Sequence, residues 1–184
     1  DGRTALHIVA ARGDDVDMVK SLLRFAVDEQ ALLEMQDSGG QTALHTALRN
    51  FSEKIAEAIL EAAEDKATLL EARDDDGYTA LHTAAELGVF HVAKQLLEKA
   101  KDKQALLEAQ DRNRQTALHV AADGPNRVDM AESLLLFADN KQALLAAQDS
   151  EGRTALHEAA EKGDAESAVK MAAEDAQAIS ANSF

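Results

Sequence analysis

The middle of the chain has two short stretches in which hydrophobic residues recur at the spacing of a helix. In the first, Leu81, Ala84 and Ala85 form an apolar stripe that ends near Gly88, a residue type common at helix C-termini. In the second, residues 92–100, pairs of apolar residues alternate with pairs of lysine, glutamine and glutamate residues. Small residues in the first stretch and leucines in the second predict two closely packed antiparallel helices.

The same pattern recurs along the chain, and every copy begins with the word Thr-Ala-Leu-His. The five copies start and end at Thr4 and His7, Thr42 and His45, Thr79 and His82, Thr116 and His119, and Thr154 and His157. Successive copies are 37 or 38 residues apart. A fixed period of this size indicates a solenoid of stacked supersecondary units.

The word has a physical role at the start of a helix. Threonine is a favourable N-cap, alanine and leucine fill the first two helical positions, and histidine falls at the third. From there a histidine side chain can reach back to the capping residue, as Glu or Gln does in a capping box. The word therefore predicts five helices that begin in the same way.

A third segment follows each pair of predicted helices. It begins with Asp or Asn and has a Leu-Leu pair in its middle, which predicts a new cap and about one helical turn. The copies are residues 28–37, 65–74, 102–111 and 140–149. The chain then enters the next unit through Asp-x-x-Gly, and because Arg114 replaces this glycine in the fourth unit, we expect a turn of different shape there.

Residues 74–88 and 149–163 both read Asp-x-x-Gly-x-Thr-Ala-Leu-His-x-Ala-Ala-x-x-Gly, a string that resembles the ankyrin repeat. The resemblance implies an all-α solenoid of stacked helix-turn-helix repeats with β-turn fingers. Two departures are alanine in place of the family's proline and a period longer than the family's roughly 33 residues. The excess falls at residues 103–106 and their equivalents, which predicts an extra helical turn per repeat. We expect one domain, 1–184, with repeats at about 1–37, 38–74, 75–111, 112–149 and 150–184.

The two ends of the chain differ. Ile8 and Val9 make the first repeat apolar, which predicts further repeats before it. Residues 164–184 are rich in alanine and polar residues, which predicts a C-terminal cap with a fraying tail.

Composition narrows the possible partners and compartments. With 34 acidic and 19 basic residues the formal charge is −15, which argues against nucleic acid or an anionic membrane and favours a protein with a basic or mixed surface. The absence of cysteine excludes disulfides and fits a reducing compartment. No apolar run approaches the ~18 residues that span a bilayer. We expect a cytoplasmic monomer, either bacterial or in a host cytosol if the protein is a secreted effector.

Catalytic and metal sites are disfavoured by the spacing of the candidate residues. The histidines of the word lie one repeat apart in a stacked array and cannot share an ion, so we expect hydrogen-bonded structural residues. Residues 74–76 are three aspartates without the flanking pattern of a calcium loop, and we expect a solvated turn. Phosphate-binding glycine loops and nucleophile motifs are absent. We therefore expect no enzyme and no cofactor, and a metal-dependent enzyme is the least favoured alternative.

The resemblance implies that the finger tips and the exposed face of each first helix contact a partner. The residues at these positions are Gln41, Tyr78, Arg112, Gln115 and Arg153 on the fingers, and Thr46, Arg49, Thr83 and Leu87 on the first helices. Tyr78 is a candidate hot spot, since aromatics are only 3% of the chain, although it can instead pack along its own finger. For Phe25, Phe90 and Phe137 we expect packing on the second helices. For Phe51 both packing and partner contact stay open.

The residues favour a non-enzymatic protein–protein interaction module that binds through a concave finger and first-helix surface. The alternative is a structural spacer or scaffold within a larger multidomain protein such as a bacterial effector.

Overall fold

The structure is a computed structural model that describes residues 1–13 and 15–163. The described residues form thirteen helices and no named strand, which confirms the all-α solenoid. The predicted C-terminal cap at 164–184 lies outside the described residues, as does the end of the fifth expected repeat. No helix in the described part of the chain combines the length and the apolar character needed to cross a bilayer.

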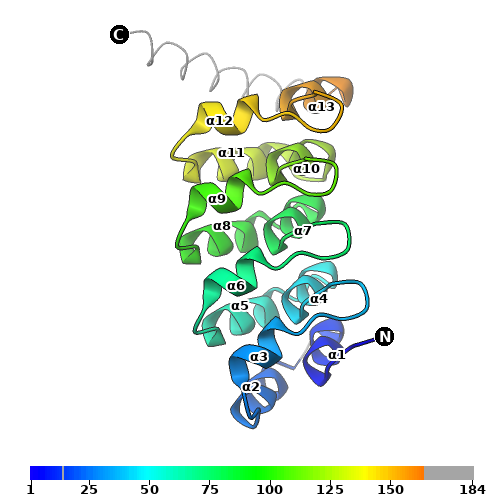
Figure 1. Ribbon diagram of the computed structural model, residues 1–184, viewed down its shortest axis with the longest axis vertical. Helices are drawn as coiled ribbons and strands as arrows, with labels where there is room; N and C mark the ends of the chain where they lie inside the picture. The colour runs from blue at the N-terminus through cyan, green and yellow to red at the C-terminus, as the bar shows by residue number, and fades with distance from the viewer. Residues whose placement is uncertain (14, 164–184) are drawn as a thin grey trace.

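Each of the first four repeats contributes three helices, and these stack along the long axis of the molecule (Figure 1). The first helices, with the one described helix of the fifth repeat, are α1 (Ala5–Arg12), α4 (Ala43–Arg49), α7 (Ala80–Leu87), α10 (Ala117–Asp123) and α13 (Ala155–Glu161). The second helices are α2 (Val16–Arg24), α5 (Glu53–Ala62), α8 (Phe90–Lys99) and α11 (Arg127–Phe137). The third helices are α3 (Glu29–Glu34), α6 (Lys66–Glu71), α9 (Lys103–Glu108) and α12 (Lys141–Ala146).

The first helices begin with the word, and each has the expected reciprocal capping box. In every copy the threonine side chain accepts from the backbone N–H of the histidine, and the histidine Nδ1 accepts from the backbone N–H of the threonine. The second of these hydrogen bonds measures 3.2–3.3 Å. Five helix starts are therefore built identically.

The core lies between the first and second helices. Successive first helices pack on one another, and in each of the first four repeats the first helix packs on the second helix of the same repeat. The leucine of each word from Leu6 to Leu118 is fully buried, as are Ile59, Leu96 and Leu134 on the second helices. Each such side chain contributes about 1.5–3 kcal/mol by leaving water, so the stack is held by many equivalent contacts.

The third helices account for the long period and confirm the predicted extra helical turn. Each has six residues and is preceded by the Asp or Asn expected as its N-cap. The Asp28 carboxylate, for example, accepts a hydrogen bond from the Ala31 N–H at 2.9 Å. A glutamine on two of them reaches the next repeat. The Gln30 amide bonds the backbone of Glu64 and Asp65, and the Gln104 amide bonds that of Asp139 and Asn140.

The fingers are tight turns that join one repeat to the next first helix. Gly40, Gly77 and Gly152 occupy the left-handed region, with φ of 71°, 83° and 79°. The expectation of a different turn at Arg114 is wrong, because Arg114 adopts φ 61° and donates to Asp111 O at 3.1 Å, as the glycines do in their own turns. A non-glycine residue there accepts a small backbone penalty so that the turn keeps its shape.

Candidate functional site

Three consecutive finger tips line one hollow beside the first helices of repeats 3 to 5. We name this hollow of about 430 Å³ the finger groove. Its lining residues are Tyr78, Glu86, Gln115, His119, Val120, Asp123, Gly124, Pro125, Arg153, Glu158, Glu161 and Lys162. Tyr78, Gln115 and Arg153 are tips expected from the sequence, whereas Glu161 and Lys162 on the other wall were not among the expected contacts.

The backbone of each tip is held by the histidine of the preceding repeat. The histidine Nε2 lies near the carbonyl oxygen of the following tip in four copies: His7 with Gln41 at 2.8 Å, His45 with Tyr78 at 3.1 Å, His82 with Gln115 at 3.1 Å and His119 with Arg153 at 3.2 Å. Because Nδ1 accepts from the threonine N–H, the ring proton lies on Nε2, which donates to the carbonyl. The word thus positions the next repeat's tip.

Burial favours the neutral form of the rings of His45, His82 and His119. Loss of solvation lowers the pKa of His45 and of His82 to about 4, against opposing contributions from Asp74 at His45 and from the Gln115 carbonyl at His82. The pKa of His119 is also lowered by burial. In the described residues no group of three or more His, Asp or Glu is placed to hold a metal ion, and the rings of these three histidines use both nitrogens for hydrogen bonds.

An aspartate holds each finger from inside. The Asp74 Oδ1 accepts from the backbone N–H of Asp76 at 3.0 Å and of Tyr78 at 2.9 Å, and the same pattern recurs at Asp37, Asp111 and Asp149. Asp74 is buried, so the expectation that all three aspartates at 74–76 are solvated is wrong for this one. Its carboxylate replaces water as the partner of two turn amides.

Tyr78 is half-buried at one edge of the groove. Its ring stacks on His82, with centroids 5.4 Å apart and planes 26° from parallel. Burial, followed by the Glu86 carboxylate, raises the pKa of Tyr78 to about 12, so the phenol is neutral at pH 7. Tyr78 therefore packs along its own finger and also lines the groove.

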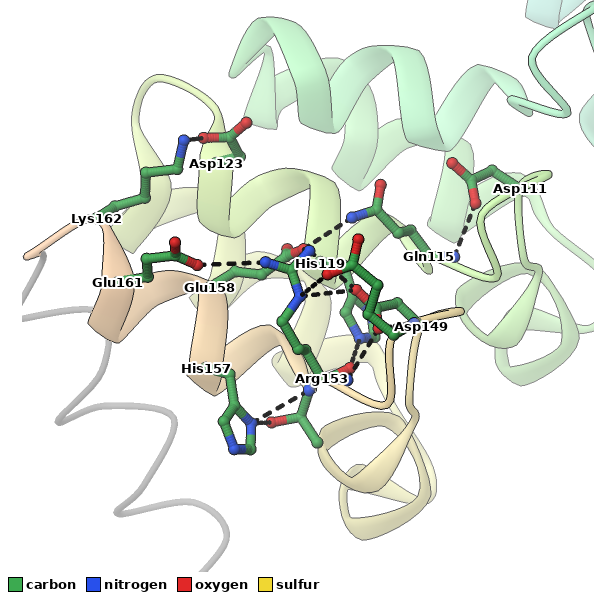
Figure 2. A network of polar contacts seen from close by, with 12 residues as sticks. Asp111, Gln115, His119, Asp123, Asp149, Arg153, His157, Glu158, Glu161 and Lys162 are labelled. Carbon is green, nitrogen blue, oxygen red and sulfur yellow. Dashed lines mark hydrogen bonds and ion pairs between the residues drawn. The ribbon is translucent and has the colours of Figure 1, made fainter.

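An acidic cluster surrounds the guanidinium of Arg153 (Figure 2), and of its carboxylates Glu158 and Glu161 line the far wall of the groove. Arg153 lies 3.2 Å from Asp149, 3.4 Å from Glu151, 3.4 Å from Glu158 and 3.2 Å from Glu161. Four carboxylates thus share one cation, and a second cation, Lys162, pairs with Asp123.

Glu158 is the most buried carboxylate that lines the groove. Only 6% of the residue is exposed. Its Oε1 accepts from Gln115 at 2.7 Å and lies 3.4 Å from Arg153 Nη2, whereas its buried Oε2 has no hydrogen-bond partner. Burial raises the pKa of Glu158, and the nearby Arg153 only partly offsets this.

The remaining expected contacts do not gather at the groove. Arg49 lies beside it and bonds Asp74 at 3.3 Å and Glu86 at 3.1 Å. Thr46 and Thr83 were expected on the exposed face of the first helix, but they are only 2% and 0% exposed, because the neighbouring first helices cover them. Arg112 is exposed and Gln41 is half-buried, both outside the groove lining.

Leu87 lies in a separate hollow at the loops between the paired helices. Phe51 and Phe90 share this hollow, and Leu87 itself is half-buried rather than exposed. The expectation that Phe25 and Phe90 pack against the core is wrong, since they are 80% and 45% exposed. Helix α2 ends one residue before Phe25, which turns that ring out of the stack, whereas Phe137 is partly buried against the core.

The bonds from histidine to the next tip could not be anticipated from the word alone, because their partners lie 33 or 34 residues away. The sequence sign that could have found them is that each of these four tips follows the histidine of the preceding repeat by 33 or 34 residues.

Comparison with protein families agrees with this geometry. A family model described as ankyrin repeats (3 copies) matches residues 1–69 and 67–144, and another described as ankyrin repeats (many copies) matches residues 118–173. Among curated proteins, none matches the chain.

Proposed function

The chain belongs to the ankyrin repeat family, and on that premise we propose that it is a non-enzymatic module that binds a protein partner on its finger and first-helix surface. Ankyrin repeats are generally protein–protein interaction modules and are generally not enzymes. The proposed surface is the finger groove with its three tips, Tyr78, Gln115 and Arg153. Thr46 and Thr83 are left out of it because they are buried.

The observation that carries the proposal is the convergence of three variable side chains on an invariant frame. The tips differ as Tyr, Gln and Arg, whereas the aspartate and the histidine that hold their backbone are the same in each repeat. Because the finger backbone is already held by hydrogen bonds, it loses little conformational entropy when a partner binds. Such preorganisation suits recognition of a folded or extended partner.

Charge defines the kind of partner. The chain carries −15 overall, and the groove lining has four carboxylates against two cations. Long-range attraction then favours a partner with a basic or mixed protein surface and disfavours the phosphate backbone of nucleic acids and anionic membranes. The module acts as a monomer in this proposal, and its cysteine-free composition is compatible with a reducing cytoplasm.

Affinity capture with a matched pair of variants tests the proposal. The wild-type chain and a Tyr78→Ala, Gln115→Ala variant are used as baits in bacterial and eukaryotic lysates, after circular dichroism shows that both are folded. Leu136→Ala is the control, because Leu136 is exposed on α11 away from the groove lining. We expect a partner that the wild type and the control retain and the groove variant loses.

Two other outcomes contradict the proposal. Equal recovery of the same partner by all three baits would show that the contact surface lies outside the groove. No specific partner in any lysate would favour the structural spacer or scaffold within a larger protein.

A further inference from the structure

Phe51 adopts a backbone conformation that glycine occupies in three other repeats. It lies six residues after the histidine of its word, and the same position is Gly13, Gly88 and Gly163 in repeats 1, 3 and 5. The three glycines have φ of 81°, 68° and 70°, and Phe51 has φ 54°. A phenylalanine in this left-handed region is strained, because its Cβ crowds the following carbonyl oxygen. Residues held in such strain cluster at sites that contact ligands.

Burial of the ring does not offset the strain at Phe51. Phe51 lies just beyond the end of α4 and is 64% exposed, and Phe90 at the start of α8 is 45% exposed. Both rings line one hollow of about 250 Å³ at the loops between first and second helices. We name it the loop hollow, and its lining includes Phe51, Glu53, Leu87, Val89, Phe90 and Asn126. Strain and exposed aromatic surface both disfavour the free chain, which is the expected state of a contact residue before its partner binds.

The size of the loop hollow fits a single anchoring side chain. Its volume of about 250 Å³ lies below the roughly 300–1,000 Å³ of pockets that enclose small-molecule ligands. At about 200 Å² for each phenylalanine, the exposed fractions leave about 200 Å² of apolar surface on the two rings. A stable dimer buries about 800 Å² on each copy, and two chains of charge −15 repel each other. The hollow therefore suits a short partner segment with one apolar anchor better than a second copy of the chain.

The charge around the loop hollow favours basic residues beside this anchor. Among the lining residues Glu53 is negatively charged at pH 7, and none is lysine or arginine. The imidazole of His91, also in the lining, lies 3.7 Å from Glu57, which adds a second carboxylate next to the hollow. Lysines or arginines that flank the anchor would be attracted by these carboxylates and by the net charge of −15.

The loop hollow adjoins the finger groove. Glu86 lines the groove, and the next residue, Leu87, lines the hollow. The same holds for Pro125 and Asn126 in the following repeat. The two loops are in contact, because the Asn126 side chain donates to the Gly88 carbonyl oxygen at 3.1 Å. One partner segment can therefore contact the groove and the hollow together.

We infer that the loop hollow is an apolar anchor site, where a phenylalanine side chain of the partner protein, flanked by basic residues, packs on Phe51 and Phe90. The inference rests on the proposed function and adds a second contact to the finger groove. Two exposed rings favour an aromatic anchor, since offset-stacked and edge-to-face ring pairs attract each other beyond the effect of their buried area.

NMR signals from the hollow give a direct test. The probe is the capped peptide Gly-Lys-Gly-Phe-Gly-Lys-Gly, titrated at low salt into the isotope-labelled full chain. One comparison peptide has alanine in place of phenylalanine, and another has aspartate in place of both lysines. We expect saturable shifts of the Phe51, Leu87 and Phe90 amide signals with the probe, and about fivefold weaker binding of either comparison peptide.

Phe51→Gly supplies the residue that repeats 1, 3 and 5 have at this position. Phe25→Ala is the matched control, because Phe25 is a phenylalanine that is 80% exposed outside the hollow lining. We expect Phe51→Gly to bind the probe about fivefold more weakly and Phe25→Ala to bind it as the wild type does. Because glycine relieves the left-handed φ, Phe51→Gly should leave the urea midpoint of unfolding unchanged or higher.

Several results would overturn the inference. These are equal affinity of wild type and Phe51→Gly for the probe, equal binding of the alanine or the aspartate peptide, and a lower urea midpoint for Phe51→Gly, which would make Phe51 a packing residue. Shifts of the same amide signals when the chain alone is concentrated would assign the hollow to a second copy instead.

The proposed function can fail or stand separately. A captured partner that is lost with Tyr78→Ala, Gln115→Ala but kept with Phe51→Gly would leave the binding module intact and exclude the anchor site. The reverse result would exclude the groove and keep the anchor site.

Discussion

The histidine of the repeat word connects two repeats with a single imidazole. Its Nδ1 closes the capping box of its own helix, and its Nε2–H donates to the finger-tip carbonyl one repeat further on. The Nδ1 bond requires the neutral Nε2–H form, since a protonated ring would present an N–H to the threonine N–H. Proton uptake therefore breaks a helix cap, whereas the bond to the next finger can remain.

Acid should accordingly weaken the fold through His45 and His82. Their pKa values of about 4 in the fold lie below the 6.5 of an unfolded chain, so the unfolded state binds protons first as the pH falls. Stability is lost between pH 6.5 and about 4, by about 2 kcal/mol per histidine between pH 7.5 and pH 5. NMR titration of the ring protons checks the cause, and midpoints near 6.5 for these two histidines would contradict it.

At the residue scale, the sequence predicts those features whose partners lie within one word. Thr79 and His82 are three residues apart, so their capping box follows from local geometry. The burial of Thr83 and the unpaired oxygen of Glu158 depend on how closely the neighbouring first helices stack, which no local pattern contains. Glu158 also occupies the position that Thr83 has in its own repeat, so only the structure distinguishes their surroundings.

Among the elements, a finger keeps its turn when its glycine is replaced, whereas the third helices have the same cap type and leucine pair in every copy. The Asp111 carboxylate still holds the backbone of Asn113 and Gln115 when Arg114 replaces glycine, and so the turn keeps its left-handed residue. The extra residues of each repeat were correctly predicted to form α3 and its equivalents. A cap residue and a leucine pair specify such a helix locally. The exposure of Phe25 depends on where α2 ends, and helix ends are poorly fixed by sequence.

Two substitutions at equivalent finger positions should have opposite effects on stability. Arg114→Gly relieves a left-handed φ of 61° and should raise the free energy of unfolding by about 0.5–1 kcal/mol. Gly77→Ala should lower it by more than about 1 kcal/mol, because its φ is 83° and its new Cβ would lie 2.9 Å from the Arg112 backbone nitrogen. Urea unfolding measures both, and destabilisation by Arg114→Gly would show that the arginine side chain makes a compensating contact.

The whole molecule is a one-dimensional stack with a large excess of negative charge. Each repeat buries its apolar face on its neighbours, so no central core is needed. With 34 acidic against 19 basic residues, repulsion acts along the entire array. The same charge that favours a basic partner therefore weakens the free protein.

Added salt should stabilise the free chain. Raising NaCl from 10 mM to 150 mM shortens the screening length from about 30 Å to about 8 Å, which relieves repulsion between distant carboxylates. Exposed pairs such as Lys94 and Glu98 lose only a few tenths of a kcal/mol in the same change. The free energy of urea unfolding should rise by on the order of 1 kcal/mol. A fall with salt would show that ion pairs outweigh the net repulsion.

The glutamines of the third helices have a mechanical consequence. Gln30 fastens the outer edge of repeat 1 to repeat 2, and Gln104 fastens repeat 3 to repeat 4. Ala67 occupies the equivalent position in α6 and carries no hydrogen-bonding group. Of these three junctions, the one between repeats 2 and 3 lacks this tie, and a glutamine joins its second helices instead, where Gln95 on α8 donates to Glu57 on α5 at 2.7 Å. The glutamine fastening therefore moves from the third helices to the second helices at this junction, which changes the layer of the stack that resists bending there.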